Sequence, residues 1–391
     1  MYVLMVTPNK FPNGDAGAVR DEYFAKIYIE LGYDVYHIGM GTETKTGTYK
    51  GIKYYSTYNE NISIVQKIRN SLNYRSNVER IYEDICKEQG EPSVIHIYDI
   101  PKSGIEWAIS IAKQNRIPII HDSVEWYSPC EFKHGKFAYP YILKNRTNTR
   151  LIRKPISVIA ISSYLQNYFR EKGLYVTRIP VVMDSNEYFP KERHEEDKIN
   201  IVYAGSPAKK DYLQECVLAY ERLSDEIKEK IEFTILGVTG EYLIECTNKK
   251  RIPKGINALG RVSRETVISH LEKADFSILL RPENERYTKA GFPTKSVEAM
   301  MNGSAMLCNI TSDLSMYLND GENAIIVKDS SIDSMYDAFI RVAELSHEEL
   351  TKLRGNARKT AECSFDYHLY VQNVNTIINE SKSGENNVHR G

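Results

Sequence analysis

A turn at the start of one helix combines the residue types that bind phosphate. The stretch RYTKAGFPTKSVEAMMNG, residues 286–303, reads as a loop that enters an amphipathic helix. The entrance consists of Gly291, Phe292, Pro293, Thr294 and Lys295. The first amide groups of a helix lack an intrahelical acceptor and carry the positive end of the helix dipole. With a hydroxyl and a lysine charge beside them, these amides predict a binding site for phosphate oxygens.

Glu298 follows about one helical turn after this entrance. Its carboxylate can accept hydrogen bonds from two neighbouring hydroxyls, such as those of a ribose. A nucleotide with its diphosphate at the helix tip would present such a pair there. The alternative needs no ligand, because a carboxylate near a helix N-terminus already interacts favourably with the dipole.

Two further loops join a strand to a helix through small residues. NKFPNGDAGAVR contains Gly14 and Gly17, which let the backbone approach a ligand, but it lacks the glycine spacing of a dinucleotide-binding loop. YAGSPAKKD offers Gly205, Ser206, Lys209 and Lys210, and GRVSRE offers Arg261 beside a glycine. Such loops can hold a diphosphate. Taken alone, each is equally well explained as an ordinary turn with solvated cations.

Polar side chains also follow an apolar run in PIIHDSVEW. We expect His121, Asp122 and Glu125 just past the end of a central strand, where polar groups serve a ligand cleft and have little use in a buried sheet. The alternative is that Asp122 only caps the next helix and that His121 donates to a backbone carbonyl. Their position favours the functional interpretation.

The order of the elements predicts an α/β fold with two doubly wound parallel sheets. Short runs rich in Val, Ile and Tyr alternate with helical patterns along the 391 residues, a length that favours two domains. The stretch FPKERHEEDK has no apolar face and reads as a linker. We therefore expect a first domain over residues 1–188, a linker over 189–198, a second domain over 199–364 and a C-terminal segment over 365–391.

Composition narrows the classes of partner. The net charge of −1 argues against nucleic acid as a partner. No apolar run reaches the length that crosses a bilayer, and no signal peptide opens the chain, so we expect a cytoplasmic protein. The six cysteines are scattered without a C-x-x-C pair and no Asp-x-Asp triad follows a strand, so we expect neither a zinc site nor a required metal or cofactor.

Five stretches resemble those of family 4 retaining glycosyltransferases, particularly bacterial members of cell-surface polysaccharide pathways. They are FPNGDAGAVRDEYFAKIYIELGYDV, IIHDSVEWYSP, VIAISSYL, VYAGSPAKKD and RPENERYTKAGFPTKSVEAMMNG. The resemblance covers almost the whole chain in the same order. It implies the GT-B fold, with two facing Rossmann-like domains and a C-terminal helix that crosses back to the first. It also implies that the second domain holds a nucleotide sugar and that the first holds the acceptor.

Carried over residue by residue, the resemblance assigns Glu298 to the ribose and the turn 291–295 to the donor diphosphate. It assigns further donor contacts to Lys210 with Lys209, to Gly14 with Gly17, and to His121 with Asp122 as its neighbour, the histidine lying beside the donor sugar.

One position departs from the family pattern. The first glutamate of the paired-glutamate motif falls at Ala290, so the role of its carboxylate toward the donor sugar is empty. Either Glu283 or Glu285 substitutes for it, or the loops around the phosphates and His121 suffice.

One segment gathers cations without any acidic side chain. Residues 132–154 interleave aromatic residues with Lys133, Lys136, Lys144, Arg146, Arg150, Arg153 and Lys154. An anionic membrane attracts each nearby cation by about 1 kcal/mol, so this patch would hold the first domain beside an acceptor carried on a lipid. A solvated helix face is the alternative.

The resemblance implies a metal-independent enzyme that transfers a sugar, with retention, from a UDP-sugar in preference to a GDP-sugar to a lipid-linked or glycan acceptor. Fixed cations and helix amides would stabilise the departing diphosphate, and we expect His121, Asp122, Lys210 and Lys295 to act in the reaction. Two alternatives stay open. One is a catalytically silent nucleotide-sugar-binding subunit, suggested by Ala290, and the other is a sugar-nucleotide epimerase of the same fold.

Overall fold

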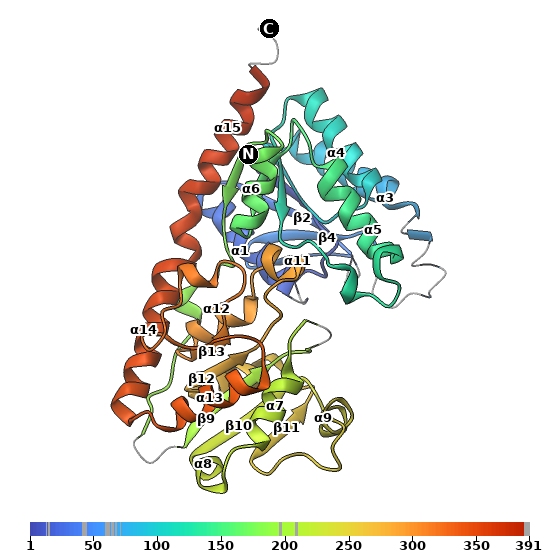
Figure 1. Ribbon diagram of the computed structural model, residues 1–391. Coiled ribbons are helices and arrows are strands. Elements are labelled where there is room, and N and C mark those ends of the chain that lie inside the picture. Colours follow the sequence, from blue (N-terminus) through green and yellow to red (C-terminus); the bar gives the residue numbers. More distant parts are fainter. Residues whose placement is uncertain are drawn as a thin grey trace. The chain divides into compact units, whose positions relative to one another are not determined.

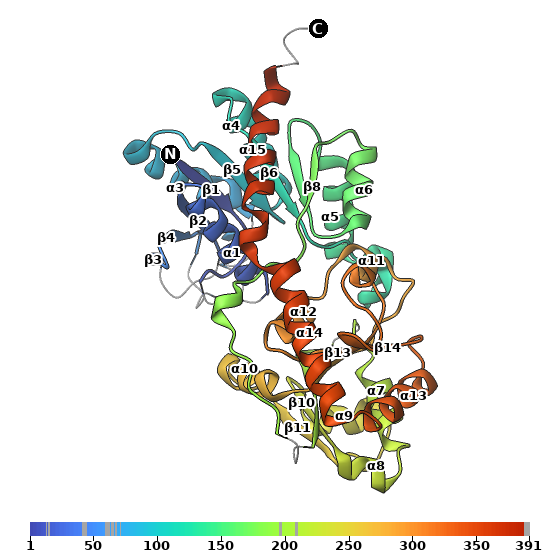
Figure 2. The same cartoon turned by 90° about the vertical axis from the view of Figure 1, so that its left-hand side faces the viewer.

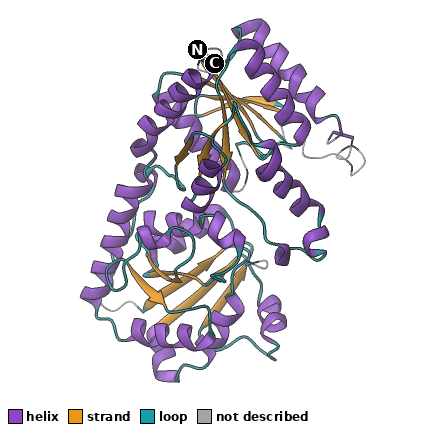
Figure 3. Cartoon of the chain, turned by 45° about the horizontal axis from the view of Figure 1, so that its top comes forward, coloured by secondary structure: helices purple, strands orange, loops and turns teal. Residues whose placement is uncertain are grey.

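The computed structural model describes residues 1–12, 14, 16–40, 45–58, 63, 66, 69–70, 72–194, 198–207 and 210–386. The chain forms two compact units. The first consists of Met1–Val182 and Tyr367–Gly391, and the second consists of Met183–Asp366. Each unit is built around its own sheet, with helices on both faces (Figure 1, Figure 3).

The first sheet has the strand order β3-β4-β2-β1-β5-β6-β7-β8 within the described residues. Its strands are β1 (Tyr2–Val6), β2 (Asp34–Gly39), β3 (Thr46–Tyr49), β4 (Ile52–Ser56), β5 (Val94–Tyr98), β6 (Ile119–Ser123), β7 (Ser157–Ala160) and β8 (Val176–Arg178). Neighbouring strands are parallel except β3 and β4, which are antiparallel. β1 and β6 are buried along their whole length, as expected for central strands of a sheet covered on both faces.

The C-terminal helix belongs to the first unit although it follows the second unit in sequence. The helices of the first unit are α1 (Ala16–Glu30), α3 (Tyr74–Gln89), α4 (Lys102–Asn115), α5 (Tyr139–Arg146), α6 (Ser163–Glu171) and α15 (Val371–Asn386). α15 contacts α1, β6 and β8 (Figure 2). Ser381 Oγ of α15 donates a hydrogen bond of 2.7 Å to Ser157 Oγ of β7. The last helix is therefore packed into this unit.

The second sheet is parallel throughout and has the order β11-β10-β9-β12-β13-β14 within the described residues. Its strands are β9 (Ile199–Ala204), β10 (Ile231–Leu236), β11 (Ile256–Gly260), β12 (Phe276–Leu279), β13 (Ala305–Asn309) and β14 (Ala324–Val327). The direction of the connections reverses between β9 and β12. At such a switch point, the loops that leave the carboxyl ends of the strands diverge and leave room for a ligand.

Helices complete the second unit. They are α7 (Leu213–Glu221), α8 (Asp225–Lys230), α9 (Gly240–Thr247), α10 (Arg264–Lys273), α11 (Arg286–Ala290), α12 (Thr294–Met301), α13 (Ile332–Ala343) and α14 (His347–Phe365). α7 contacts α9 and α13, whereas α12 packs against α14. Within the described residues of the chain, no helix combines the length and apolar character needed to cross a bilayer.

The second unit begins before the charged stretch that we expected to separate the domains. Met183 forms a parallel bridge with Asp366. Asp366 Oδ2 also accepts hydrogen bonds from Ser185 N (3.0 Å) and Ser185 Oγ (2.5 Å). Further on, Lys191 O accepts a hydrogen bond of 2.7 Å from Arg354 of α14. Residues 183–191 are therefore bound to the second unit. Part of the expected linker, residues 195–197, lies outside the described residues.

Truncating Ile377 tests how α15 is attached. Its side chain is fully buried, so Ile377→Ala should lower the free energy of unfolding by about 2–5 kcal/mol through lost burial and a residual cavity. Asn373→Ala, at an exposed position of the same helix, should change it by no more than about 0.5 kcal/mol. Urea denaturation followed by circular dichroism measures both, and equal effects would contradict the packing of α15.

Candidate functional site

One buried carboxylate, Asp211, organises the carboxyl edge of the second sheet. Asp211 lies in the loop between β9 and α7. Its Oδ2 accepts hydrogen bonds from Tyr203 Oη (2.8 Å) and Lys295 Nζ (2.5 Å). Its Oδ1 accepts one from Arg281 Nε (2.8 Å). Tyr203 lies near the end of β9, Arg281 follows β12 and Lys295 lies in the first turn of α12. Asp211 therefore joins these segments at the switch point.

The Asp211 cluster keeps a net positive charge. Burial raises the pKa of Asp211, but the Arg281 and Lys295 cations outweigh burial and hold the pKa of that carboxyl below its ordinary value. Burial lowers the pKa of Lys295, against the opposing effect of Asp211. The ammonium also lies 4.5 Å from the centre of the Tyr203 ring. Two cations thus face one carboxylate, and Lys295 is held by protein partners.

Glu298 lies further along α12 and is largely buried. Its side chain is 17% exposed, and its Oε1 lies 3.0 Å from a terminal nitrogen of Arg264, the first residue of α10. Burial raises the pKa of Glu298, and Arg264 opposes that rise. The carboxylate that the sequence relates to ribose therefore already has one cationic partner.

Phe292 anchors the turn that enters α12. Its buried ring lies 5.8 Å from the ring of Tyr317 and 5.7 Å from that of Phe365, centroid to centroid. Gly291 N donates to Tyr287 O at 3.0 Å and closes α11. Pro293 then precedes α12, which begins at Thr294. The first amides of a helix have no acceptor within that helix.

Asn309, at the end of β13, fixes the segment that leaves β12. Its side-chain amide accepts from Arg281 N (2.9 Å) and donates to Arg281 O (2.6 Å) and Glu283 Oε1 (2.7 Å). Glu283 Oε2 accepts a hydrogen bond of 3.0 Å from Ser330 Oγ. Both carboxylate oxygens of Glu283 therefore have protein partners, whereas Glu285 makes no side-chain hydrogen bond that caps α11.

The loop after β9 lies beside α11 and α12. Gly205 has φ +128°, a conformation that favours glycine, and a Cβ there would stand 3.1 Å from Lys295 Nζ. The ammonium of Lys210 lies 5.9 Å from the centre of the Tyr287 ring, and Tyr287 Oη donates to Lys210 O at 3.4 Å. The structure therefore brings Gly205 and Lys210 to the same edge as the turn 291–295.

Three other expected donor contacts are less closely tied to this edge. Ser206 is exposed directly after Gly205, and Arg261 is exposed directly after β11. Lys209 lies outside the described residues.

In the first unit, both glycines of the loop after β1 lie against protein atoms. A Cβ on Gly17 would come within 2.8 Å of Asn9 Cγ, and one on Gly14 within 3.3 Å of the Lys10 carbonyl carbon. Asn9 in turn donates a hydrogen bond of 2.8 Å to Asp21 Oδ2 of α1. Close packing within the loop explains the two glycines without a ligand.

Asp122 lies inside β6, whereas we expected it just past the end of that strand. Its carboxylate accepts hydrogen bonds from Arg20 Nε (2.6 Å) and from a terminal nitrogen of Arg20 (2.8 Å). Arg20 also donates to Pro180 O at 2.8 Å. Both side chains are buried. The ion pair ties α1 to β6 and to the segment after β8, which corrects the expectation of an open polar group at Asp122.

His121 also lies inside β6 and is buried. Neither ring nitrogen has a hydrogen-bond partner within the described residues. Burial, with the nearby Lys144 cation as the second cause, lowers the pKa of His121 to about 3. The imidazole is therefore neutral at physiological pH. Glu125, past the strand, accepts a hydrogen bond of 2.6 Å from Tyr127 Oη.

The cations of the basic segment 132–154 are exposed, with the exception of Lys144. The exposed cations are Lys133, Lys136, Arg146, Arg150, Arg153 and Lys154. The ammonium of Lys144 is buried and lies 2.7 Å from Asp99 Oδ1. Because α5 directs this side chain inward, Lys144 does not contribute to a surface patch, contrary to the expectation from sequence.

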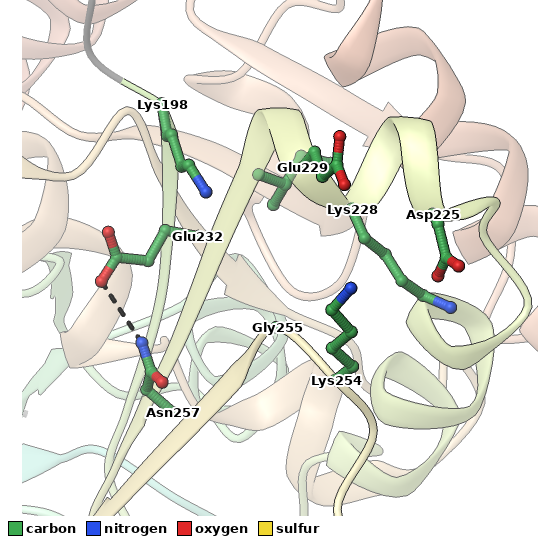
Figure 4. Close-up of a pocket in the computed structure, with 9 residues that line it drawn as sticks. Lys198, Asp225, Lys228, Glu229, Glu232, Lys254, Gly255 and Asn257 are labelled. Atoms are coloured by element: carbon green, nitrogen blue, oxygen red, sulfur yellow. Dashed lines mark hydrogen bonds between the residues drawn. The ribbon is translucent and has the colours of Figure 1, made fainter.

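A separate hollow of about 280 Å³ lies at the opposite edge of the second sheet (Figure 4). Lys198 precedes β9, Ile231 begins β10 and Gly255 precedes β11, so the hollow is at the amino ends of these strands. Its other lining side chains, among them Lys254 and Glu229, carry both signs of charge. It does not belong to the candidate site.

Sequence reasoning missed the residues that hold the site together. In the second unit these are Tyr203, Asp211, Arg281 and Asn309. In the first unit, sequence reasoning missed Arg20, the partner of Asp122. One available signal was position, since Asp211 and Arg281 stand just after two strands that a doubly wound sheet places side by side. The pairing itself depends on side-chain directions that a sequence does not reveal.

The architecture defines the class of protein. Two parallel-sheet α/β units and a C-terminal helix that returns to the first form the GT-B fold, which confirms the expected fold class. Sucrose-phosphate synthase from Thermosynechococcus elongatus matches over 98% of this chain and 100% of its own, with a TM-score of 0.75 and 11% identity. HepE from Anabaena, solved in complex with UDP and glucose, matches over 97% and 100% with a TM-score of 0.68 and 12% identity.

The sequence comparisons relate the second unit to sugar transferases. Residues 184–360 match the family described as glycosyl transferases group 1. Over 279 residues, 68% of either chain, the sequence is 26% identical to an uncharacterized glycosyltransferase of Methanocaldococcus jannaschii. Residues 184–360 are thus similar to group 1 glycosyl transferases, and both findings support a sugar transferase.

The buried His121 predicts how stability depends on pH. Its pKa is about 3 in the folded state and about 6.5 when unfolded, so the unfolded state binds the extra proton in between. Stability from this group is complete above pH 6.5 and is lost as the pH falls toward 3, with a slope of up to about 1.4 kcal/mol per pH unit.

Replacing the imidazole by an apolar side chain should remove that slope. His121→Leu should flatten the fall in unfolding free energy below pH 6.5. His134→Gln, at an exposed position of the same unit, should leave the fall unchanged. Denaturant titrations at several pH values measure both variants, and a slope retained in His121→Leu would refute the assignment.

Proposed function

We propose that this chain is a retaining glycosyltransferase that moves a sugar from a nucleotide sugar to a lipid-linked or glycan acceptor in cell-surface polysaccharide synthesis. The observation that carries the proposal is the edge of the second unit at the β9/β12 switch point. There Gly205 lies beside Lys295 at the start of α12, Lys210 lies beside Tyr287 of α11, and Glu298 follows one turn along α12. This arrangement suits a diphosphate followed by a ribose.

The same edge would assist departure of the nucleotide. When the bond between the sugar carbon and the diphosphate oxygen breaks, negative charge grows on the leaving phosphate. Lys210 and the first amides of α12 stabilise that charge, and the net positive Asp211 cluster adds to the field. Lys295 contributes through this cluster, since Asp211 already holds its ammonium. In this proposal no divalent metal is needed.

Retention then follows from attack on the leaving-group face. The acceptor oxygen bonds to the sugar carbon as the diphosphate leaves, and the diphosphate takes the acceptor proton. Asp122 is bound to Arg20 and serves structure, so we assign it no catalytic step. His121 is neutral, and next to the donor sugar it would act as a hydrogen-bond donor and not as a cation.

A UDP-sugar is the donor that we favour. HepE, which shares the fold, was solved with UDP and with UDP-glucose. Ala290 supplies no carboxylate for the sugar, and Glu283 is held by Asn309 and Ser330. Of the two proposed substitutes, Glu285 therefore remains.

Ala290 also favours a second candidate, a nucleotide-sugar-binding subunit without turnover. The two candidates differ in one measurable quantity. An enzyme releases nucleoside diphosphate from the donor when an acceptor is present, whereas a silent subunit binds the donor without releasing it. An epimerase, in turn, would convert the sugar of the donor without any acceptor.

Lys210→Ala tests the proposed contact with the diphosphate. Donors are first ranked by the rise in melting temperature that each nucleotide sugar causes, because a ligand that binds the folded state stabilises it. With the best donor and a polyprenyl diphosphate-linked acceptor, Lys210→Ala should lower kcat for nucleotide release by about 100-fold through lost stabilisation of the leaving group.

Lys230→Ala is the matched control. Lys230 is an exposed lysine of α8, at the opposite edge of the same sheet, so its removal changes the charge of the unit without touching the site. Equal activity of the two variants, or donor binding without release in the unaltered protein, would overturn the enzyme proposal.

Association with an anionic membrane belongs to the same proposal. Beside the exposed cations of residues 132–154, Phe137 is 87% exposed and Tyr139 is 72% exposed. Ile142 and Leu143 of α5 are also exposed. Exposed aromatic and aliphatic side chains among cations suit the interface of an anionic bilayer, where a lipid-linked acceptor would be presented.

Vesicle sedimentation tests this surface. The protein should bind vesicles containing phosphatidylglycerol more tightly than phosphatidylcholine vesicles, and Arg150→Gln should weaken binding about fivefold, the equivalent of one interfacial cation. Phe137→Ser should weaken it as well by removing apolar contact. Lys113→Gln, an exposed cation of α4, is the control. If the fraction of bound protein depends neither on lipid charge nor on these substitutions, the membrane is removed from the proposal.

A further inference from the structure

The ion pair between Arg264 and Glu298 connects two loops of the site edge. Arg264 opens α10, after the loop that leaves β11, and Glu298 belongs to α12, after the loop that leaves β12. The closest nitrogen-oxygen distance is 3.0 Å. Exposed ion pairs contribute little to stability. Here only the arginine is exposed, at 53%, whereas the carboxylate is mostly withdrawn from solvent. The pair therefore matters most for the state of the carboxylate.

The backbone of Arg264 is held in place by a helix cap. Ser263 Oγ accepts a hydrogen bond of 3.3 Å from Thr266 N at the start of α10. Before the cap, Gly260 turns the chain out of β11 with φ +66°. The guanidinium thus reaches Glu298 from a fixed helix start.

Arg264 is the charged group that acts on Glu298 within the described residues. On α12 itself, the ammonium of Lys295 is bound to Asp211. On α14, the helix packed against α12, Arg354 and Arg358 donate to backbone carbonyls, those of Gly303 and Met301 among them. These three cations have other partners.

We propose that Arg264 is a positioning residue for the nucleotide: it holds the Glu298 side chain as an oriented carboxylate that accepts the hydroxyls of the ribose. The inference rests on the proposed function, because it specifies how the donor site recognises its nucleotide. With Oε1 bound to Arg264, the carboxylate is fixed in direction and keeps acceptor capacity for the 2′-hydroxyl. Arg264 need not touch the donor itself.

This role has a consequence for pH. Burial raises the pKa of Glu298 and Arg264 opposes that rise, so loss of the guanidinium shifts protonation of the carboxyl to higher pH. A protonated carboxyl is a weaker acceptor for a hydroxyl. As the pH is lowered, a protein without Arg264 should therefore lose recognition of the 2′-hydroxyl at a higher pH than the unaltered protein does.

The experiment compares UDP with 2′-deoxy-UDP, and GDP with 2′-deoxy-GDP, by isothermal titration calorimetry between pH 5 and pH 8. The unaltered protein should prefer the ribonucleotide by about tenfold, the effect of one hydrogen bond to a charged group. Arg264→Gln should reduce that preference. It should also raise the pH below which the preference is lost. Arg264→Lys, which keeps the charge, should restore much of the preference.

Lys273→Gln, at an exposed position near the end of the same helix, controls for the loss of a charge from α10. A merely structural Arg264 would weaken ribonucleotide and deoxyribonucleotide equally and leave the pH profile in place, and that result overturns the inference. If Glu298→Gln abolishes the preference and Arg264→Gln does not, only the role of Arg264 fails. If no nucleotide binds to the unaltered protein, the proposed function fails with it.

Discussion

The buried carboxylate of Asp211 is the constraint on which the candidate donor site depends. An ionised group without contact to water needs charged or polar partners, and removing one partner of such a pair costs on the order of 3–5 kcal/mol. Tyr203, Lys295 and Arg281 supply these partners from the end of β9, the start of α12 and the exit of β12. These segments therefore cannot move independently. The start of α12, which we assign to the diphosphate, is therefore held in position because the buried Asp211 carboxylate needs Lys295 as a partner.

The first unit solves a similar problem at the start of α1. Two consecutive residues of this helix serve two different loops. Arg20 reaches Asp122 inside β6, while Asp21 receives Asn9 from the loop after β1. Since Asn9 packs against Gly17, the path of the glycine loop follows from the position of Asp21. In both units, a buried carboxylate with partners from other elements determines where a loop runs.

The spacing of apolar residues and the residues typical of turns were sufficient to predict the alternation of strands and helices. The reason is that a parallel sheet covered on both faces requires continuous apolar strands. These signals failed where one residue overrides the pattern. β8 ends at Arg178 although apolar residues continue to Val182, because Pro180 lacks the amide hydrogen that a ladder requires. The pattern did not predict β3, because its short sequence TGTY has no apolar periodicity. Among the described strands, β3 pairs with β4 alone.

Site residues were harder to predict for a related reason. A sequence shows that Lys144 and Lys295 are cations, but not which carboxylate each will meet. The structure gives Lys144 to Asp99 and Lys295 to Asp211. His121 shows the converse case, because a polar residue at a strand end became a neutral, buried one when the strand extended past it. Spacing predicts where a residue lies along the chain, whereas the charge that it presents depends on partners distant in sequence.

The departure at Ala290 separates two kinds of donor selectivity. Glu298, the carboxylate that we propose for the ribose, has its own cationic partner on α10. Ala290 is buried and carries no carboxylate, and Glu283 is bound by Asn309 and Ser330. In the proposed donor site, the nucleotide and the sugar are therefore recognised by different groups, so we expect that one specificity can change without the other. Of the carboxylates near that position in sequence, Glu285 is then the one that we propose for the sugar.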